Sequence, residues 1–131
     1  LVSETIAPAF IPALVTELQS SGVEIRGCPK THAIAHSVKE ASAQDWDTEF
    51  LDLVLAIRVV NGLDEAISHI DQHSSNHTAS IVTENEKSSE RFLREVDGAV
   101  ESQIYHMDIY QAMTHIQNFL LEEYQLRVHL M

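Results

Sequence analysis

Three sets of side chains in this sequence could bind a ligand or take part in a reaction. His69, His73 and His77 are spaced four residues apart, so on one continuous helix they would share a face and two of them could bind zinc. Cys28 is the only thiol in the sequence and could act as a nucleophile if a base activated it. Glu49 directly precedes an apolar segment, where a carboxylate can bind a ribose hydroxyl.

The histidine spacing has a plainer explanation than a metal site. Ser74, Ser75 and Asn76 predict the end of the helix before His77, and no His-Glu-x-x-His motif accompanies the histidines. We therefore expect a solvated helix face followed by a loop histidine, and no metal ligands. The adjacent pair His77-Thr78 precedes a predicted strand, where it either lines a site or forms a polar turn.

Cys28 and Glu49 also allow two interpretations. Cys28 lies between Gly27 and Pro29 at the end of a short predicted strand, and no activating base can be identified from the sequence. A single cysteine at a turn is typical of an inert thiol, so we do not expect Cys28 to be a nucleophile. From spacing alone, Glu49 is a solvated loop residue.

The apolar pattern predicts an α/β domain that would position these groups. The segment from Leu51 to Val60 is almost wholly Val, Ile and Leu, as in a parallel strand covered on both faces. Helix, strand and helix follow it, an order that implies right-handed crossovers and a parallel sheet. Asn61 with Asp64, and Thr83 with Glu86, are predicted to cap the two helices.

The remaining elements are predicted from the helical spacing of apolar residues and from the positions of proline and glycine. They are a helix over 3–20 with Pro8 in its first turn, a kink or a delayed start at Pro12 and an end at Ser21-Gly22, a strand over 23–26, a weak helix over 30–40, a polar loop over 41–48, a strand over 79–83 and a C-terminal helix over 109–124. The length of 131 residues fits one domain or a piece of a larger one.

Composition excludes several classes of partner. A formal net charge of −12 at pH 7 repels phosphate backbones and anionic lipid, so we expect neither nucleic acid nor a membrane surface as a partner. No apolar run reaches the roughly 18 to 20 residues of a membrane span, and no basic N-terminal region indicates a signal peptide. A single cysteine excludes an internal disulfide and favours a reducing, cytoplasmic location.

Short motifs run in a fixed order through the first part of the chain. They are Ile6-Ala7, Phe10 to Leu14, Gly22 to Gly27, Asp47 to Leu51, Leu63 to Ile67 with His69-Ile70, His77-Thr78 with Ile81 to Asn85, and Phe92-Leu93 with Val96-Asp97. Through them, residues 1–100 resemble gamma-glutamyl phosphate reductases (glutamate-5-semialdehyde dehydrogenases), members of the aldehyde dehydrogenase superfamily. The resemblance implies an incomplete aldehyde-dehydrogenase-like catalytic domain over 1–100 and a divergent, helical tail over 101–131.

The resemblance also implies an activity and a cofactor. Family members are oxidoreductases of proline biosynthesis, which use NADPH to reduce L-glutamate 5-phosphate to L-glutamate 5-semialdehyde through a thioester on a cysteine. Glu49 stands where the superfamily has a glutamate that contacts the ribose on the nicotinamide side of the cofactor. The pair His77-Thr78 belongs to a motif of the family, which makes both residues substrate-side candidates.

Two departures from the family limit what the chain is expected to do alone. The nucleophilic cysteine and the cofactor domain of the family are expected upstream of Leu1, and Cys28 does not occupy the nucleophile position. After Val100 the Asn-Ala-Ser-Thr-Arg-Phe type strand of the family does not follow. We therefore expect an inactive fragment of an enzyme that acts on a small molecule, with a homo-oligomer left open. The alternative is a non-enzymatic interaction module that uses the amphipathic helix over 109–124.

Overall fold

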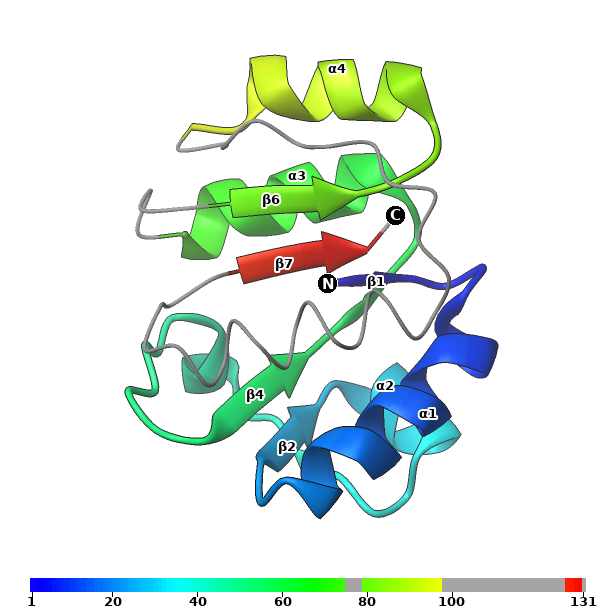
Figure 1. Cartoon of the computed structure of the whole chain (residues 1–131). Helices are drawn as coiled ribbons and strands as arrows, with labels where there is room; N and C mark the ends of the chain where they lie inside the picture. Colours follow the sequence, from blue (N-terminus) through cyan, green and yellow to red (C-terminus); the bar gives the residue numbers. More distant parts are fainter. Residues whose placement is uncertain (75–78, 98–126, 131) are drawn as a thin grey trace.

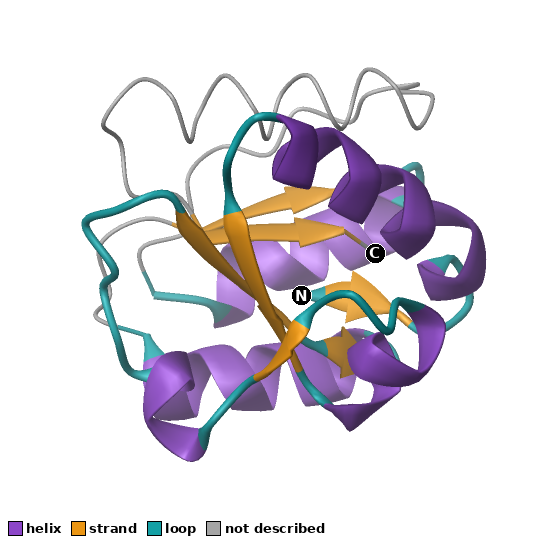
Figure 2. Cartoon of the chain, turned by 90° about the horizontal axis from the view of Figure 1, so that it is seen from below, coloured by secondary structure: helices purple, strands orange, loops and turns teal. Residues whose placement is uncertain are grey.

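The computed structural model describes residues 1–74, 79–97 and 127–130 (Figure 1). In chain order the elements are β1 (Val2–Ser3), α1 (Ala7–Ser20), β2 (Glu24–Gly27), α2 (Pro29–Ile34), β3 (Lys39–Glu40), the 3₁₀ helix η1 (Ala43–Trp46), β4 (Val54–Ile57), β5 (Val59–Val60), α3 (Leu63–His73), β6 (Ala79–Val82), α4 (Glu86–Glu95) and β7 (Arg127–Leu130). All strand pairs in these ranges are parallel, and helices lie on both sides of the strands (Figure 2). The predicted α/β class is confirmed, while the helix predicted over 109–124 lies outside the described residues.

The strands form two sheets, which corrects the prediction of one. One sheet has the order β3-β2-β4 and the other β5-β1-β7-β6. The apolar segment over 51–60 contributes β4 to the first sheet and β5 to the second, and Arg58 lies between these two strands. The Ile57 carbonyl accepts a hydrogen bond from the Cys28 N–H at 3.0 Å, and the Arg58 carbonyl accepts one from the Val2 N–H at 2.9 Å. The predicted single strand is therefore one extended segment that joins two sheets.

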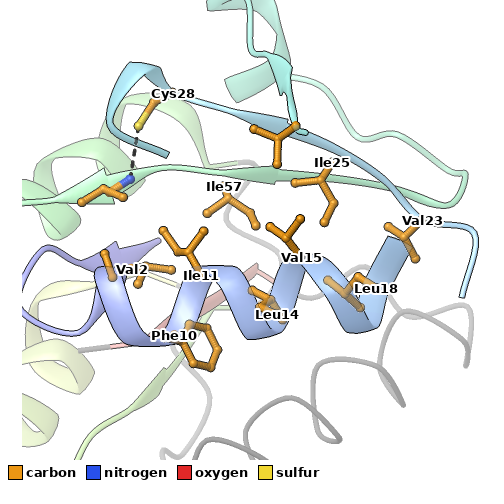
Figure 3. Packing of buried hydrophobic residues seen from close by; sticks show 13 residues of the cluster. Val2, Phe10, Ile11, Leu14, Val15, Leu18, Val23, Ile25, Cys28 and Ile57 are labelled. Atoms are coloured by element: carbon orange, nitrogen blue, oxygen red, sulfur yellow. Dashed lines mark hydrogen bonds between the residues drawn. The ribbon is translucent and has the colours of Figure 1, made fainter. Parts of the chain in front are cut away.

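Helix α1 packs its apolar stripe between the strands of both sheets (Figure 3). The buried residues of this cluster include Phe10, Ile11, Leu14, Val15 and Leu18 of α1 with Val2, Val23, Ile25 and Ile57. The helix begins at Ala7, and the predicted start at residue 3 was wrong because the preceding residues pair with β5. Pro12 lies on the exposed side of α1, so the buried stripe continues past it.

The C-terminal end of α1 was predicted correctly from Ser21-Gly22. The Val23 N–H donates to the Leu18 carbonyl at 3.0 Å and the Gly22 N–H donates to the Gln19 carbonyl at 3.0 Å. Gly22 has a φ of +81°, the left-handed conformation that this Schellman-type ending requires. The weak helix predicted over 30–40 is shorter in the structure, where α2 ends at Ile34 and β3 follows.

Helix α3 is capped by a different carboxylate from the one predicted. Gly62, with a φ of +94°, occupies the N-cap, and the carboxylate of Glu65 accepts a hydrogen bond from the Asn61 N–H at 2.7 Å. Asp64 does not take this role, since the helix starts after Gly62 and Asp64 pairs with Arg91 at 2.6 Å. Glu65 also pairs with Arg58 at 3.1 Å.

Helix α4 begins with a cap from Asn85 in place of the predicted Thr83 and Glu86 box. The Asn85 side chain accepts a hydrogen bond from the Ser88 N–H at 3.1 Å, while the Thr83 hydroxyl accepts one from the Asn85 N–H at 3.1 Å. Helices α3 and α4 bury a second apolar cluster on β6, made of Ile67, Ile70, Ala79, Ile81, Phe92 and Val96. Within the described ranges, no helix has the length and apolarity that crossing a lipid bilayer requires.

Candidate functional site

Glu49 lies on the loop between η1 and β4, and its side chain is exposed. Because β4 begins at Val54, Glu49 is at the amino end of this strand. Open α/β sheets ordinarily bind ligands outside the carboxyl ends of their strands. Strand topology alone therefore does not identify Glu49 as a ligand-binding residue. The contacts that hold its loop decide how the Glu49 side chain is presented.

The buried carboxylate of Asp45 holds the start of this loop. It accepts hydrogen bonds from the Ser42 N–H at 2.7 Å and the Ser42 hydroxyl at 2.9 Å, and Arg26 Nη1 lies 2.6 Å away. The Ser42 N–H lowers the pKa of Asp45 most, burial opposes it, and the Arg26 guanidinium and the Ser42 hydroxyl lower the pKa further. Arg26 also pairs with Glu24 at 2.9 Å, so this network fastens the loop to β2.

Asp45→Asn should lower the free energy of unfolding by about 1 to 2 kcal/mol at pH 7, through the lost charge and weakened cap. Because folding depresses the pKa of Asp45, its contribution is present above the unfolded value near 4 and is lost as pH falls through the folded value. Urea unfolding at pH 7 and pH 3 should therefore show a difference from wild type that shrinks in acid. Asp71→Asn, an exposed change on α3, is the matched control, and an equal loss in both variants would contradict the buried network.

A second set of contacts joins the loop to α3. The Trp46 ring packs edge-on against His69 with centroids 5.6 Å apart, and Asp47 Oδ1 lies 2.7 Å from Nδ1 of His73. His73 is the last residue of α3, so the chain leading to His77-Thr78 starts beside the loop that carries Glu49. The pair His77-Thr78 itself lies outside the described residues.

Beyond Glu49, the loop is held by an aromatic contact. The Arg26 guanidinium lies 5.1 Å from the centroid of the Phe50 ring. The next residue, Leu51, has a φ of +49° and is 83% exposed. A leucine in this left-handed conformation is strained and persists only where its neighbours enforce it. Glu49 is thus presented to solvent between two anchored positions, Asp47 and Phe50.

The histidines do not assemble into a larger cluster with other ligand types. Over the residues that the structure describes, no three His, Cys, Asp or Glu side chains are placed to share a metal ion. The rings of His69 and His73 are 4.5 Å apart, but Nδ1 of His73 is engaged by Asp47. Helix α3 ends at His73, as predicted, so the shared helix face is restricted to these two histidines.

Cys28 is packed into the core, where its sulfur makes two polar contacts. The sulfur lies 3.4 Å from the Thr31 hydroxyl and accepts a hydrogen bond from the Val59 N–H at 3.4 Å (Figure 3). Burial raises the pKa of the thiol, but hydrogen bonding with Thr31 and with backbone N–H groups outweighs burial and lowers it overall. With 6% of its surface exposed, Cys28 has little room to meet a substrate, which supports a structural role.

Comparison with known proteins places this arrangement in context. No family model matches the chain. A protein from Caldanaerobacter subterraneus subsp. tengcongensis is 54% identical over 99 residues, which cover 76% of this chain and 24% of that protein. A Thermotoga maritima protein is 50% identical over the same length. Both proteins are named gamma-glutamyl phosphate reductase. This chain is similar to that enzyme.

The solved structure of the Thermotoga maritima gamma-glutamyl phosphate reductase agrees with this finding. It matches with a TM-score of 0.76 and 47% identity, over 79% of this chain and 25% of that chain. The resemblance predicted from the short motifs is therefore confirmed, as is the α/β architecture. The chain spans about a quarter of the length of the gamma-glutamyl phosphate reductases that it matches.

The residues that hold the Glu49 loop were not predicted from the sequence. Ser42 and Asp45 stand three residues apart, the spacing of a capping box, so this anchor could have been found from a local pattern. The contact between Asp47 and His73 joins residues 26 positions apart and has no local signal.

Proposed function

We propose that this chain forms part of the catalytic domain of a gamma-glutamyl phosphate reductase, a cytoplasmic oxidoreductase of proline biosynthesis. The complete enzyme would use NADPH, which supplies a hydride, to convert L-glutamate 5-phosphate to L-glutamate 5-semialdehyde and phosphate. The observation that carries this proposal is the match to the Thermotoga maritima reductase, at 47% identity and a TM-score of 0.76.

Within that enzyme, the role that we propose for Glu49 is to accept hydrogen bonds from a ribose of the cofactor. An ionised carboxylate is an acceptor with two oxygens, which suits the paired hydroxyls of a ribose. Glu49 is exposed, and the contacts of Asp47 and Phe50 restrict the loop on either side. Such restriction lowers the entropy cost of binding.

The function is best tested in a chimera, because the chain corresponds to about a quarter of its relatives. Residues 1–97 would replace the matching segment of the Thermotoga maritima reductase, and NADPH oxidation would be measured with L-glutamate 5-phosphate. We expect activity from the chimera and none from the isolated chain. A folded but inactive chimera, or activity of the isolated chain that Cys28→Ser abolishes, would overturn the proposal.

Glu49→Gln in the active chimera should raise the KM for NADPH about tenfold, because a charge-assisted hydrogen bond is weakened. Glu17→Gln, on the exposed side of α1, is the matched control and should leave the KM unchanged. The KM for L-glutamate 5-phosphate should also stay within about twofold. An unchanged KM for NADPH in Glu49→Gln would remove Glu49 from the cofactor site while leaving the reductase assignment intact.

A further inference from the structure

His69 and His73, one helical turn apart on α3, contact two consecutive residues of the loop that leads to Glu49. The ring of His69 packs edge-on against Trp46, with centroids 5.6 Å apart. Nδ1 of His73 lies 2.7 Å from Oδ1 of Asp47. The two histidine rings are themselves 4.5 Å apart. These four side chains, which we call the histidine clamp, therefore form one continuous set of contacts between α3 and the loop.

The histidine clamp joins parts of the chain that belong to different sheets. The loop leads into β4 of the three-stranded sheet, whereas α3 packs on β6 of the four-stranded sheet through Ile67 and Ile70. Contacts at two consecutive loop residues fix the orientation of the loop as well as its position. Glu49 follows Asp47 by two residues, so their Cα atoms are at most about 8 Å apart. A change in the clamp therefore acts on Glu49 over a very short distance.

The hydrogen bond between His73 and Asp47 has a defined direction. An ionised carboxylate only accepts hydrogen bonds, so Nδ1 of His73 is the donor. The neutral ring with its proton on Nδ1 and the imidazolium can both donate in this way. An asparagine at this position would carry its amide nitrogen the same number of bonds from Cα as Nδ1, whereas the amide of a glutamine would lie one bond further out. Asparagine can therefore replace the donor, and glutamine is a poor substitute.

The exposure of this contact argues against a mainly stabilising role. The side chain of Asp47 is 60% exposed and that of His73 is 23% exposed. Hydrogen bonds and ion pairs between exposed side chains contribute little to the free energy of unfolding. A weak contact nevertheless narrows the range of positions that a surface loop adopts, and a loop held in its binding position binds a ligand more tightly. We therefore expect the clamp to affect ligand affinity more than stability.

We propose that His73 is a positioning residue, which acts through Asp47 to hold the Glu49 carboxylate where it binds the ribose of the cofactor. The proposal rests on the ribose-binding role that we propose for Glu49, and it gives His73 no contact with cofactor or substrate. His69 has the supporting role of keeping Trp46 against α3. Loss of the His73 donor then weakens cofactor binding only through Glu49.

The first test uses Trp46, the single tryptophan of the full-length chain, as a reporter of loop movement. His73→Ala should raise the acrylamide quenching constant of Trp46 fluorescence about twofold, because a released loop opens more often. His73→Gln should resemble His73→Ala, and His73→Asn should stay close to wild type. Gln72→Ala, an exposed change at the neighbouring position of α3, is the matched control and should leave quenching unchanged.

Urea unfolding of the same variants checks that each is folded, and the midpoints should lie close together. A quenching constant in His73→Ala equal to that of wild type would mean that His73 does not hold the loop. An equal rise in Gln72→Ala, or in His73→Asn, would mean that the donor at Nδ1 is not responsible. Each of these results overturns the proposal without reference to the reductase function.

The second test measures cofactor kinetics in the active chimera. His73→Ala should raise the KM for NADPH about threefold and leave kcat and the KM for L-glutamate 5-phosphate within about twofold. His73→Asn should restore the KM for NADPH. In a chimera that already carries Glu49→Ala, the same His73→Ala change should add less than about 1.5-fold, because two residues that act through one contact are not additive.

The outcomes separate this proposal from the one on which it rests. A rise of about threefold that persists in the Glu49→Ala background would mean that His73 acts independently of Glu49. An unchanged KM for NADPH in His73→Ala, together with a raised KM in Glu49→Ala, would remove the positioning role and leave the role of Glu49 intact. An inactive chimera, or a Glu49→Ala variant with an unchanged KM for NADPH, would overturn both.

Discussion

Phe92→Ala should lower the free energy of unfolding by about 3 to 5 kcal/mol, which is a large share of the stability of a small domain. Phe92 is 0% exposed, and its ring fills the space between α4, α3 and β6. The neighbouring side chains Ile67, Ile70, Ile81 and Val96 belong to elements of fixed spacing, so they cannot close the cavity that alanine leaves. Urea unfolding followed by far-ultraviolet circular dichroism measures the loss.

The matched control for this substitution is Leu93→Ala, one residue further along α4. Leu93 is 39% exposed, so its truncation should cost about 1 kcal/mol or less. Both variants have the same change in helix propensity to within a few tenths of a kcal/mol, since alanine replaces a large apolar residue in each. Equal losses in the two variants would show that the buried face of α4 is not the one described.

The elements that could be predicted from sequence are those fixed by near neighbours in the chain. The segments 63–73, 79–82 and 86–95 carry apolar residues at helical or strand spacing, and the structure confirms their type. The end of α1 at Gly22 was equally accessible, because the left-handed turn there is a local requirement. In each case the information lies within about one or two helical turns of the residue concerned.

One error arose where a distant partner decides the local structure. Residues 51–60 have the pattern of one strand. The Val2 N–H donates a hydrogen bond to the Arg58 carbonyl, however, and the segment is divided between two sheets. A second error was local: the helix α3 starts one residue later than predicted, with Gly62 as its N-cap, so that Glu65 and not Asp64 accepts the hydrogen bond from the Asn61 N–H. The candidate site also depends on a partner that is distant in the sequence, since the contact of Asp47 with His73 depends on how η1 and α3 are packed. The role proposed for Glu49 rests on family resemblance and not on spacing alone.

Gly27→Ala should destabilise the protein by about 2 to 3 kcal/mol, through overpacking and a strained hydrogen bond. A Cβ at this position would lie 2.7 Å from Cγ2 and 2.8 Å from Cβ of Thr31, and 3.0 Å from Cγ2 of Val38. Thr31 cannot move away freely, because it is 0% exposed and its hydroxyl donates to the Ile57 carbonyl at 3.0 Å. Thermal and urea unfolding of the variant measure the loss.

The control for Gly27→Ala is Gly22→Ala, which separates steric crowding from backbone strain. A Cβ at Gly22 meets no atom within 4 Å, but the φ of +81° costs about 1 to 2 kcal/mol for any other residue. The double variant Gly27→Ala/Thr31→Ser removes the 2.7 Å contact and keeps the hydroxyl, so it should recover part of the loss in stability. The double variant Gly22→Ala/Thr31→Ser should recover none.

Because Thr31 also contacts the sulfur of Cys28 at 3.4 Å, displacing Thr31 in Gly27→Ala should expose the thiol. A rise of about tenfold or more in the rate of thiol labelling under native conditions would report that displacement. If Gly27→Ala is as stable as wild type and its thiol stays protected, the close approach of β2 to α2 is not as described.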